Sequence, residues 1–295
     1  MLWEDNLFCF LKRKGKKQTE KNGVGVVDKN PRVFAAVSSN VGCVRENNED
    51  NFLLGRFKNE AMENTCVFDW DTASGRWLLV GIFDGMGGGD AGEIAAQLTA
   101  KVFATAFEKL NESTRLAEVD IIMRSSFLDA NNLIVDMQRE CGIYGTTGTV
   151  LVINGSLWKV YHVGDSRAYL FREGQLIQQT RDQTLAQMKI DVGIYSAEDP
   201  RVSEEKHKLT EYIGKDQTKA HLRPLESDWM EAKPGDNFLL CSDGLYDMCS
   251  DQEITAIIEI AEEPCKCVES LVEAACAHGG DDNVTCVCLQ IGQWT

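Results

Sequence analysis

The chain has 295 residues, 43% of them hydrophobic, so it can bury a core as one large domain or two ordinary ones. Its net charge of -16 disfavours a nucleic-acid partner, because proteins that bind nucleic acid normally present a basic surface. The 11 cysteines include no CxxC pair, which argues against a structural zinc site. Without a recognisable secretory signal, we expect reduced thiols and a cytoplasmic protein.

The first 32 residues differ in character from the rest of the chain. The stretch LFCFLKRKGKK places a short apolar run before a basic cluster. The run is far shorter than the ~20 residues that a membrane-spanning helix needs, and basic blocks are usually solvated. We therefore expect a flexible tail at 1–32, no transmembrane span and a globular domain over 33–295.

The globular part begins with strands and continues with two helices. Strand patterns cover 32–40, 51–57 and 76–84, and apolar residues at helical spacing follow over about 90–110 and 115–139. Further strands cover 146–153, 156–163, 166–172 and 175–180, with tight turns at Asn154-Gly155 and Glu173-Gly174. Hairpin-joined strands and paired helices predict antiparallel sheets under helix layers, an α+β fold.

The last third mixes an irregular insert with helices. Residues 180–189 have a helical pattern, whereas 190–228 is polar and only weakly helical in its middle. An insert of this kind is more often a functional loop than a packed layer. A strand over 236–243, helices over 251–262 and 265–278, and a closing strand over 283–291 complete the chain.

A glycine cluster after the third strand allows a dinucleotide-binding interpretation. Gly87, Gly89 and Gly92 match GxGxxG between a strand and a helix. A dinucleotide-binding unit needs a second parallel strand after that helix, but a second long helix follows here. No GxxxxGK[ST] sequence is present, so a P-loop is excluded as well. An oxidoreductase is therefore disfavoured.

Acidic residues recur at the ends of the predicted strands. Asp84 and Asp243 each end a buried strand and precede a glycine, and Asp282 precedes the closing strand. Glu49 and Asp50 precede the second strand, and Asp165 lies between two later ones. A single Asp-Gly pair is typical of a turn. In antiparallel sheets, however, one strand ends beside the start of its neighbour, so these carboxylates can share one edge. Such a cluster needs cations, and oxygen ligands suit Mg²⁺ or Mn²⁺.

Eight blocks of sequence carry a family resemblance. In chain order they are RENNED, FDGMGGGDAGEIA, GTTGTVLVI, HVGDSRAYLFREGQL, TRDQTLAQ, LTEYIG, PGDNFLLCSDGLYD and GGDDNVTCVCL. Over about residues 33 to 291 the sequence resembles the metal-dependent serine/threonine protein phosphatases of the PP2C type, also called PPM, and DGMGG is similar to the bacterial branch. The resemblance implies a four-layer α-β-β-α sandwich of two antiparallel sheets flanked by helix pairs, with 190–228 as a flap.

The resemblance also implies two Mg²⁺ or Mn²⁺ ions, with room for a third. Asp84 would bridge the pair, and the carbonyl of Gly85 would bind one ion. Asp50 would bind through its carboxylate or a coordinated water, and Glu49 chiefly through water. The glycines would then let the chain turn sharply and approach the ions.

The other matching residues would complete the site. Asp243 and Asp282 would bind the other ion, and Asp165 would share a weaker third ion with Asp243. Arg45 would hold the substrate phosphate with its planar guanidinium. The implied reaction is hydrolysis of phosphoserine or phosphothreonine by in-line attack of a water that bridges the two ions, which makes Asp84 and Arg45 the catalytic residues.

The match departs from the animal enzymes where they carry a histidine after Asp-Gly. This chain has Met86 there, so we expect a water on the metal to protonate the leaving group. We interpret His162 as a strand residue and His207, His221 and His278 as surface or loop residues. The family often has Asp-His-Ser where Asp182-Gln183-Thr184 stands here, a difference that we interpret as structural drift.

The same sequence argues against two alternatives to an active metal-dependent phosphatase. A phosphatase-like regulatory or binding module would be expected to have lost metal carboxylates, and here they are present. A cysteine-based phosphatase is disfavoured, because no cysteine is followed six positions later by arginine. The expected partners are phosphorylated proteins, the substrates of a serine/threonine kinase, and the expected state is a monomer.

Overall fold

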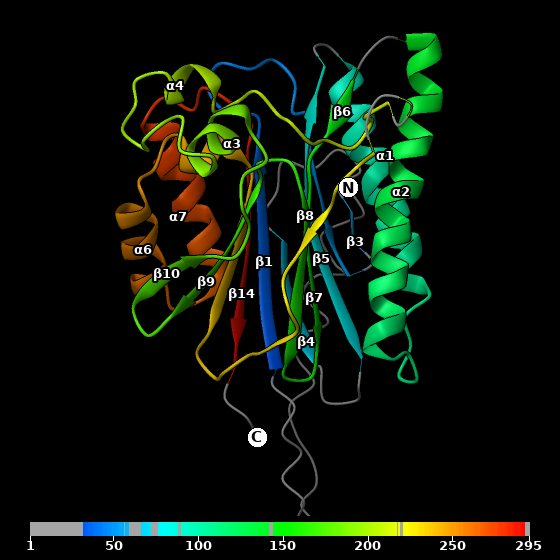
Figure 1. The fold of residues 1–295 in the computed structure, drawn as a ribbon. Coiled ribbons are helices and arrows are strands. Elements are labelled where there is room, and N and C mark those ends of the chain that lie inside the picture. The colour runs from blue at the N-terminus through cyan, green and yellow to red at the C-terminus, as the bar shows by residue number, and fades with distance from the viewer. Residues whose placement is uncertain are drawn as a thin grey trace, which may run out of the picture.

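The computed structural model describes residues 32–55, 57–58, 66–71, 76–87, 90–141, 144–216, 218 and 221–292. Two sheets stack face to face, with one helix pair on each outer side (Figure 1). This confirms the predicted α+β, four-layer sandwich. The predicted tail at 1–32 lies outside the described residues except for Arg32, which begins the first strand.

One sheet has six strands, and every neighbouring pair in it is antiparallel. Their order is β10 (Gln175–Gln178), β9 (Arg167–Arg172), β13 (Asn237–Cys241), β14 (Val284–Ile291), β1 (Arg32–Asn40) and β4 (Cys66–Asp71). The first strand thus pairs with the last. No strand was predicted at β4, because its charged residues interrupt the apolar pattern.

The other sheet is also antiparallel. Its order is β11 (Leu225–Glu226), β8 (Leu157–Val163), β7 (Gly148–Asn154), β5 (Trp77–Met86), β2 (Asp50–Leu54) and β3 (Phe57–Lys58), with β12 (Met230–Glu231) on β8 and β6 (Gly145–Thr146) on β5. Two predicted turns form. Gly155 lies between β7 and β8 with φ 56°, and Glu173 (φ 54°) and Gly174 (φ 76°) join β9 to β10. Such positive φ values are those of tight hairpin turns.

Alternating side chains of β5 explain the layers. Leu79 and Phe83 pack against α1 (Asp90–Glu108) and α2 (Leu116–Cys141), whereas Leu78, Val80 and Ile82 enter the core between the sheets. Successive side chains of a strand point to opposite faces, so a strand buried on both faces is apolar throughout. The outer face of the six-stranded sheet is covered by α6 (Asp251–Ile260) and α7 (Pro264–Ala277).

Three short helices complete the description. They are α3 (Leu185–Asp191), α4 (Val202–Glu205) and α5 (Asp243–Tyr246). The helix predicted at 180–189 begins only at Leu185, because the Thr184 side chain accepts from the amide of Gln187 and caps the helix there. Among the helices that the structure describes, none combines the length and apolar character needed to cross a bilayer.

Candidate metal centre

Asp50 and Asp84 lie opposite each other on β2 and β5, as register partners of an antiparallel pair. β13 and β14 are antiparallel neighbours too, so Asp243 just after β13 lies near Asp282 just before β14. A pocket of about 560 Å³ opens at this edge. Its lining includes seven of the eight candidate residues, Arg45, Glu49, Asp84, Gly85, Asp165, Asp243 and Asp282, while Asp50 is 97% buried beside them.

Burial and mutual repulsion raise the pKa values of carboxyl groups in this cluster. Burial raises the pKa of Asp84 well above its usual value, and the charges of Asp50, Asp243, Asp165 and Asp282 raise it further. Asp84 is thus the electrostatic centre of the cluster. Carboxylates crowded in this way hold their charge only when cations offset it.

Three other carboxyl groups of the site also have raised pKa values. Burial raises the pKa of Asp50 to about 7, although hydrogen bonds from Thr285 and Ser242 lower it. Burial and the charge of Asp243 likewise raise the pKa of Asp165 and of Asp282. An all-oxygen donor set of this kind fits hard divalent cations such as Mg²⁺ or Mn²⁺.

Close contacts explain why glycines follow Asp84. A Cβ at Gly85 would lie 2.3 Å from the carbonyl oxygen of Gly92 and 2.6 Å from that of Glu49. A Cβ at Gly92 would lie 2.3 Å from a carboxylate oxygen of Glu49. Real Cβ atoms do not approach other atoms so closely, so the start of α1 can sit on the Glu49 loop only because these residues are glycines.

Small hydroxyl residues that the sequence analysis did not single out hold the two central aspartates. The amide of Asp84 donates to Oγ1 of Thr147 (2.9 Å), and its carbonyl accepts from the Thr147 amide (2.8 Å) and the Thr146 hydroxyl (2.9 Å). The Ser242 hydroxyl donates to the Asp50 carboxylate (2.7 Å). Their sequence signal was membership of two blocks that carry the family resemblance, GTTGTVLVI and PGDNFLLCSDGLYD.

Asn283 is a second residue that the sequence analysis missed. Its Oδ1 accepts from the amide of Glu49 (2.8 Å), and its Nδ2 donates to the carbonyls of Val41 and Asn47 (both 2.9 Å). One amide side chain therefore ties the 41–49 loop to the segment that carries Asp282. Hydrogen bonds from one buried amide thus fix the loop at three points.

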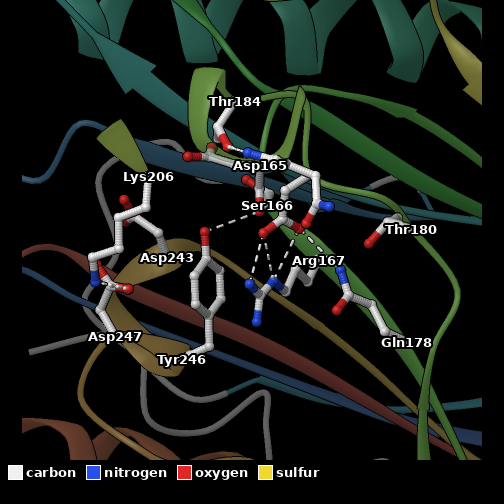
Figure 2. A network of polar contacts seen from close by, with 12 residues as sticks. Asp165, Ser166, Arg167, Gln178, Thr180, Thr184, Lys206, Asp243, Tyr246 and Asp247 are labelled. Atoms are coloured by element: carbon white, nitrogen blue, oxygen red, sulfur yellow. Dashed lines mark hydrogen bonds and ion pairs between the residues drawn. The ribbon is translucent and has the colours of Figure 1, made fainter. Parts of the chain in front are cut away.

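A network behind the pocket holds Asp165 (Figure 2). The hydroxyl of Tyr246 donates to the Asp165 carbonyl (3.1 Å), and the guanidinium of Arg167 stacks 3.7 Å from the centre of the Tyr246 ring. Arg167 also forms a two-pronged ion pair with Asp182, 2.6 Å at its shortest, and Gln178 donates to Asp182 (2.9 Å). Tyr246 thus holds the Asp165 carbonyl, and its ring is stacked on a guanidinium that is paired with Asp182.

The same segment explains the Asp-Gln-Thr sequence. Oε1 of Gln183 accepts from the amide of Gly164 (2.8 Å), and its Nε2 donates to the carbonyl of Arg223 (2.9 Å). Gln183 therefore bridges the residue before Asp165 and the end of the 190–228 insert. Gln183 thus has a bridging role that the sequence analysis did not predict.

His207 is an exposed loop residue, as the sequence predicted, but it also contacts the acidic cluster. It lines the pocket, with Nδ1 3.4 Å from Asp243 and Nε2 3.3 Å from Asp247. A hydrogen bond to Asp243 and the charge of Asp247 raise its pKa. The adjacent Lys206 pairs with Asp247 at 2.6 Å, so the insert is attached to α5 beside the carboxylates. The sequence could not reveal this contact, because nothing local specifies where a long insert folds back.

Arg45 lies at the mouth of the pocket. Its guanidinium pairs with the Asp282 carboxylate at 2.7 Å, and about half of its side chain remains exposed. An exposed guanidinium beside a carboxylate cluster can donate hydrogen bonds to a phosphate while the cluster holds cations.

Comparison with known proteins agrees with this architecture. The family model described as "Protein phosphatase 2C" matches residues 39–189, so the chain belongs to the protein phosphatase 2C family. It is 33% identical over 259 residues to the serine/threonine protein phosphatase PstP of Mycobacterium tuberculosis, which covers 87% of this chain and 44% of PstP. The chain thus spans less than half the length of that relative. It is also 26% identical to the serine/threonine phosphatase stp of Listeria welshimeri, over 84% of this chain and 92% of that protein.

Solved structures of bacterial phosphatases have the same fold. The catalytic domain of PstP in complex with two manganese ions matches with a TM-score of 0.68 at 31% identity, over 89% of this chain and all of that one. The S. agalactiae serine/threonine phosphatase matches with a TM-score of 0.75 at 25% identity, over 88% of this chain and 99% of that one. These relatives support the bacterial branch that the DGMGG block indicated.

Proposed function

We propose that the chain is a metal-dependent protein phosphatase that hydrolyses phosphoserine and phosphothreonine. The observation that carries the proposal is the convergence of Asp50, Asp165, Asp243 and Asp282 on Asp84, next to an exposed arginine. The family match and the manganese-containing PstP structure support it. Residues 33–295 would form the catalytic domain, with the basic tail outside it and the insert at 190–228 as its flap.

Two Mg²⁺ or Mn²⁺ ions would lie among the carboxylates, with a weaker third site. Asp84 and the backbone carbonyl of Gly85 would help to hold them. The carboxylates that complete the set are Glu49, Asp50, Asp165, Asp243 and Asp282. When bound, the ions activate a water for in-line attack on phosphorus and offset charge on the phosphoryl oxygens.

The protein's own residues would position the substrate and the cluster. Arg45 would orient the phosphate with two N–H donors, which favours the in-line geometry. Thr147 would keep Asp84 in place, because it bonds both the amide and the carbonyl of that residue. Asn283 would hold the loop that presents Arg45 to the substrate and Glu49 to the metal ions.

The substrates would be phosphoproteins produced by a serine/threonine kinase, acted on in the cytoplasm by a monomer. A catalytically weak regulatory module is the other candidate. It is disfavoured because the carboxylate set is complete and its members adjoin one pocket. Such a module needs no cluster of carboxyl groups with raised pKa values, whereas an enzyme that binds catalytic cations does.

Hydrolysis of p-nitrophenyl phosphate and of phosphoserine and phosphothreonine peptides tests the proposal. Turnover is expected with Mn²⁺ or Mg²⁺ and is expected to stop with EDTA. The matched variants are Asp84→Asn, which removes the central charge, and Asp129→Asn, an exposed acid on α2. Equal turnover by Asp84→Asn and the unaltered chain would reject the assignment, as would metal-independent turnover.

A further inference from the structure

Two cysteines lie side by side next to the metal centre and have no part in the proposed hydrolysis. Cys43 is on the loop that carries Arg45, and Cys276 is in the last turn of α7. The Cys43 thiol donates to the Cys276 carbonyl, with 3.6 Å between Sγ and O. The Cys276 thiol in turn lies 3.9 Å from Oδ1 of Asn40, just before the same loop.

Backbone contacts hold the two segments in this arrangement. The Cys43 amide donates to the carbonyl of Gly280 at 2.7 Å. Gly280 has φ +57°, and a Cβ there would lie 2.9 Å from Sγ of Cys43 and 3.2 Å from Cα of Cys276. The absence of a side chain at 280 therefore leaves the Cys43 sulfur directly over residue 276. A disulfide between them needs rotation of the two side chains and a shift of Cys43 toward Cys276.

Cys43 is more accessible to solvent than the other cysteines whose exposure the structure describes. Cys43 is exposed and Cys276 is half-buried, whereas Cys241, Cys286 and Cys288 are buried. Burial raises the pKa of Cys241 to about 12 and raises the pKa of Cys286 as well, which makes these thiols inert. An oxidant from solution therefore reaches Cys43 first and finds a second thiol beside it.

We propose that Cys43 and Cys276 form a peroxide-sensitive pair that closes into a disulfide and weakens phosphate binding at the adjacent Arg45. Hydrogen peroxide accepts two electrons from the Cys43 thiolate, its O–O bond breaks, and Cys43 becomes a sulfenic acid with release of hydroxide. The Cys276 sulfur then attacks the Cys43 sulfur, the S–O bond breaks, and a water leaves with the thiol proton. The sum is two thiols and one peroxide giving one disulfide and two waters.

The packing of the loop around Gly42 connects the proposed disulfide to the Arg45–Asp282 pair. A Cβ at Gly42 would lie 2.2 Å from the carbonyl oxygen of Asp282, so the residue before Cys43 already packs tightly on the Asp282 segment. A shift of Cys43 toward Cys276 is therefore passed on to the Arg45–Asp282 pair rather than absorbed. This effect rests on the proposed phosphatase function, whereas disulfide formation does not.

Peptide mapping of the full chain after peroxide treatment tests bond formation. Remaining thiols are alkylated, and the expected product is a linked pair of tryptic peptides, one containing Cys43 and the other beginning after Lys266. Because that second peptide holds further cysteines, Cys276→Ser identifies the partner and is expected to abolish the link, as Cys43→Ser does. Cys265→Ser, at the other end of α7, is expected to keep it. Oxidation without this link, or a link that survives Cys276→Ser, overturns the proposal.

Kinetics then test the consequence. Peroxide is expected to raise KM for a phosphopeptide at least about threefold with little change in kcat, reversibly with dithiothreitol, because ground-state phosphate binding is affected. Cys43→Ser and Cys276→Ser are expected to keep the reduced chain's kinetics after peroxide. An unchanged KM despite a complete link refutes the regulatory effect. A reduced chain without turnover would instead refute the phosphatase assignment and leave the mapped link intact.

Discussion

Asp50 and Asp84 are direct register partners on β2 and β5, so two carboxyl groups face each other across one antiparallel pair. Strand partners of like charge destabilise a sheet. Here the cost is increased by burial, which raises the pKa of both groups. The site is thus unfavourable for the apoprotein and favourable once cations are present, and this balance leads to the first two predictions.

Replacing Asp84 with Asn is expected to stabilise the protein in EDTA while abolishing metal-dependent turnover. The change removes the charge that four neighbouring carboxylates oppose, and keeps the side-chain volume. We expect a higher melting temperature than that of the unaltered chain in EDTA, and a much smaller increase on adding Mn²⁺. Scanning calorimetry with and without metal measures both. A lower melting temperature in EDTA would contradict the electrostatic account.

The stability of the metal-free protein is expected to fall as pH rises. The folded-state pKa of Asp50 is about 7 against an ordinary 3.8, so the folded state binds more protons than the unfolded state between these values. Stability from this group is fully present below pH 3.8 and is lost as pH rises through about 7, on the order of a few kcal/mol.

Urea unfolding in EDTA at pH 5 and pH 8 measures this change. The Asp50→Asn variant serves as the control, because it lacks the titrating group and is expected to show a smaller difference between the two pH values. Saturating Mn²⁺ is expected to remove the difference as well. Equal pH dependence in the variant and the unaltered chain would assign the effect to other groups.

Arg45→Lys is expected to raise KM for phosphopeptides about tenfold, since an ammonium group cannot reproduce the two parallel hydrogen bonds of a guanidinium. The effect on kcat should be smaller if the contact exists in the ground state. Steady-state kinetics at saturating Mn²⁺ test this. Arg115→Lys is the matched control, because Arg115 is exposed at the start of α2 and pairs only with Glu118 among the contacts described. Equal KM values in both variants would remove Arg45 from substrate binding.

Asn283→Ala is expected to lower the free energy of unfolding by about 1–3 kcal/mol, because it leaves the Glu49 amide and two loop carbonyls without their partner. Loosening the 41–49 loop is also expected to weaken Mn²⁺ binding, which isothermal titration calorimetry measures. Asn111→Ala, on the α1–α2 connection far along the chain from the pocket, controls for the loss of an asparagine. Stability loss with unchanged metal affinity would limit Asn283 to a structural role.

The layered fold could be predicted because its signals are local and periodic. The pattern at 32–40 corresponds to β1, and both hairpin turns formed where Asn-Gly and Glu-Gly pairs predicted them. The edge position of Asp84 and Asp243 followed from one rule about antiparallel strands. The roles of Asn283, Thr147 and His207 could not be predicted in this way. Their side chains act on partners far away in sequence, and single polar residues in loops carry no periodic signal.

The register of β2 against β5 determines both the packing of the hydrophobic core and the position of the acidic pair. Sliding β2 by a single residue would turn Asp50 to the opposite face and push Phe52 and Leu54 out of the inter-sheet core. A chain with the wrong register thus loses both the apolar packing and the acidic pair. Packing of the hydrophobic layer therefore selects the register that forms the site. An insertion within β2 should therefore never yield a well-folded protein that merely lacks its metals.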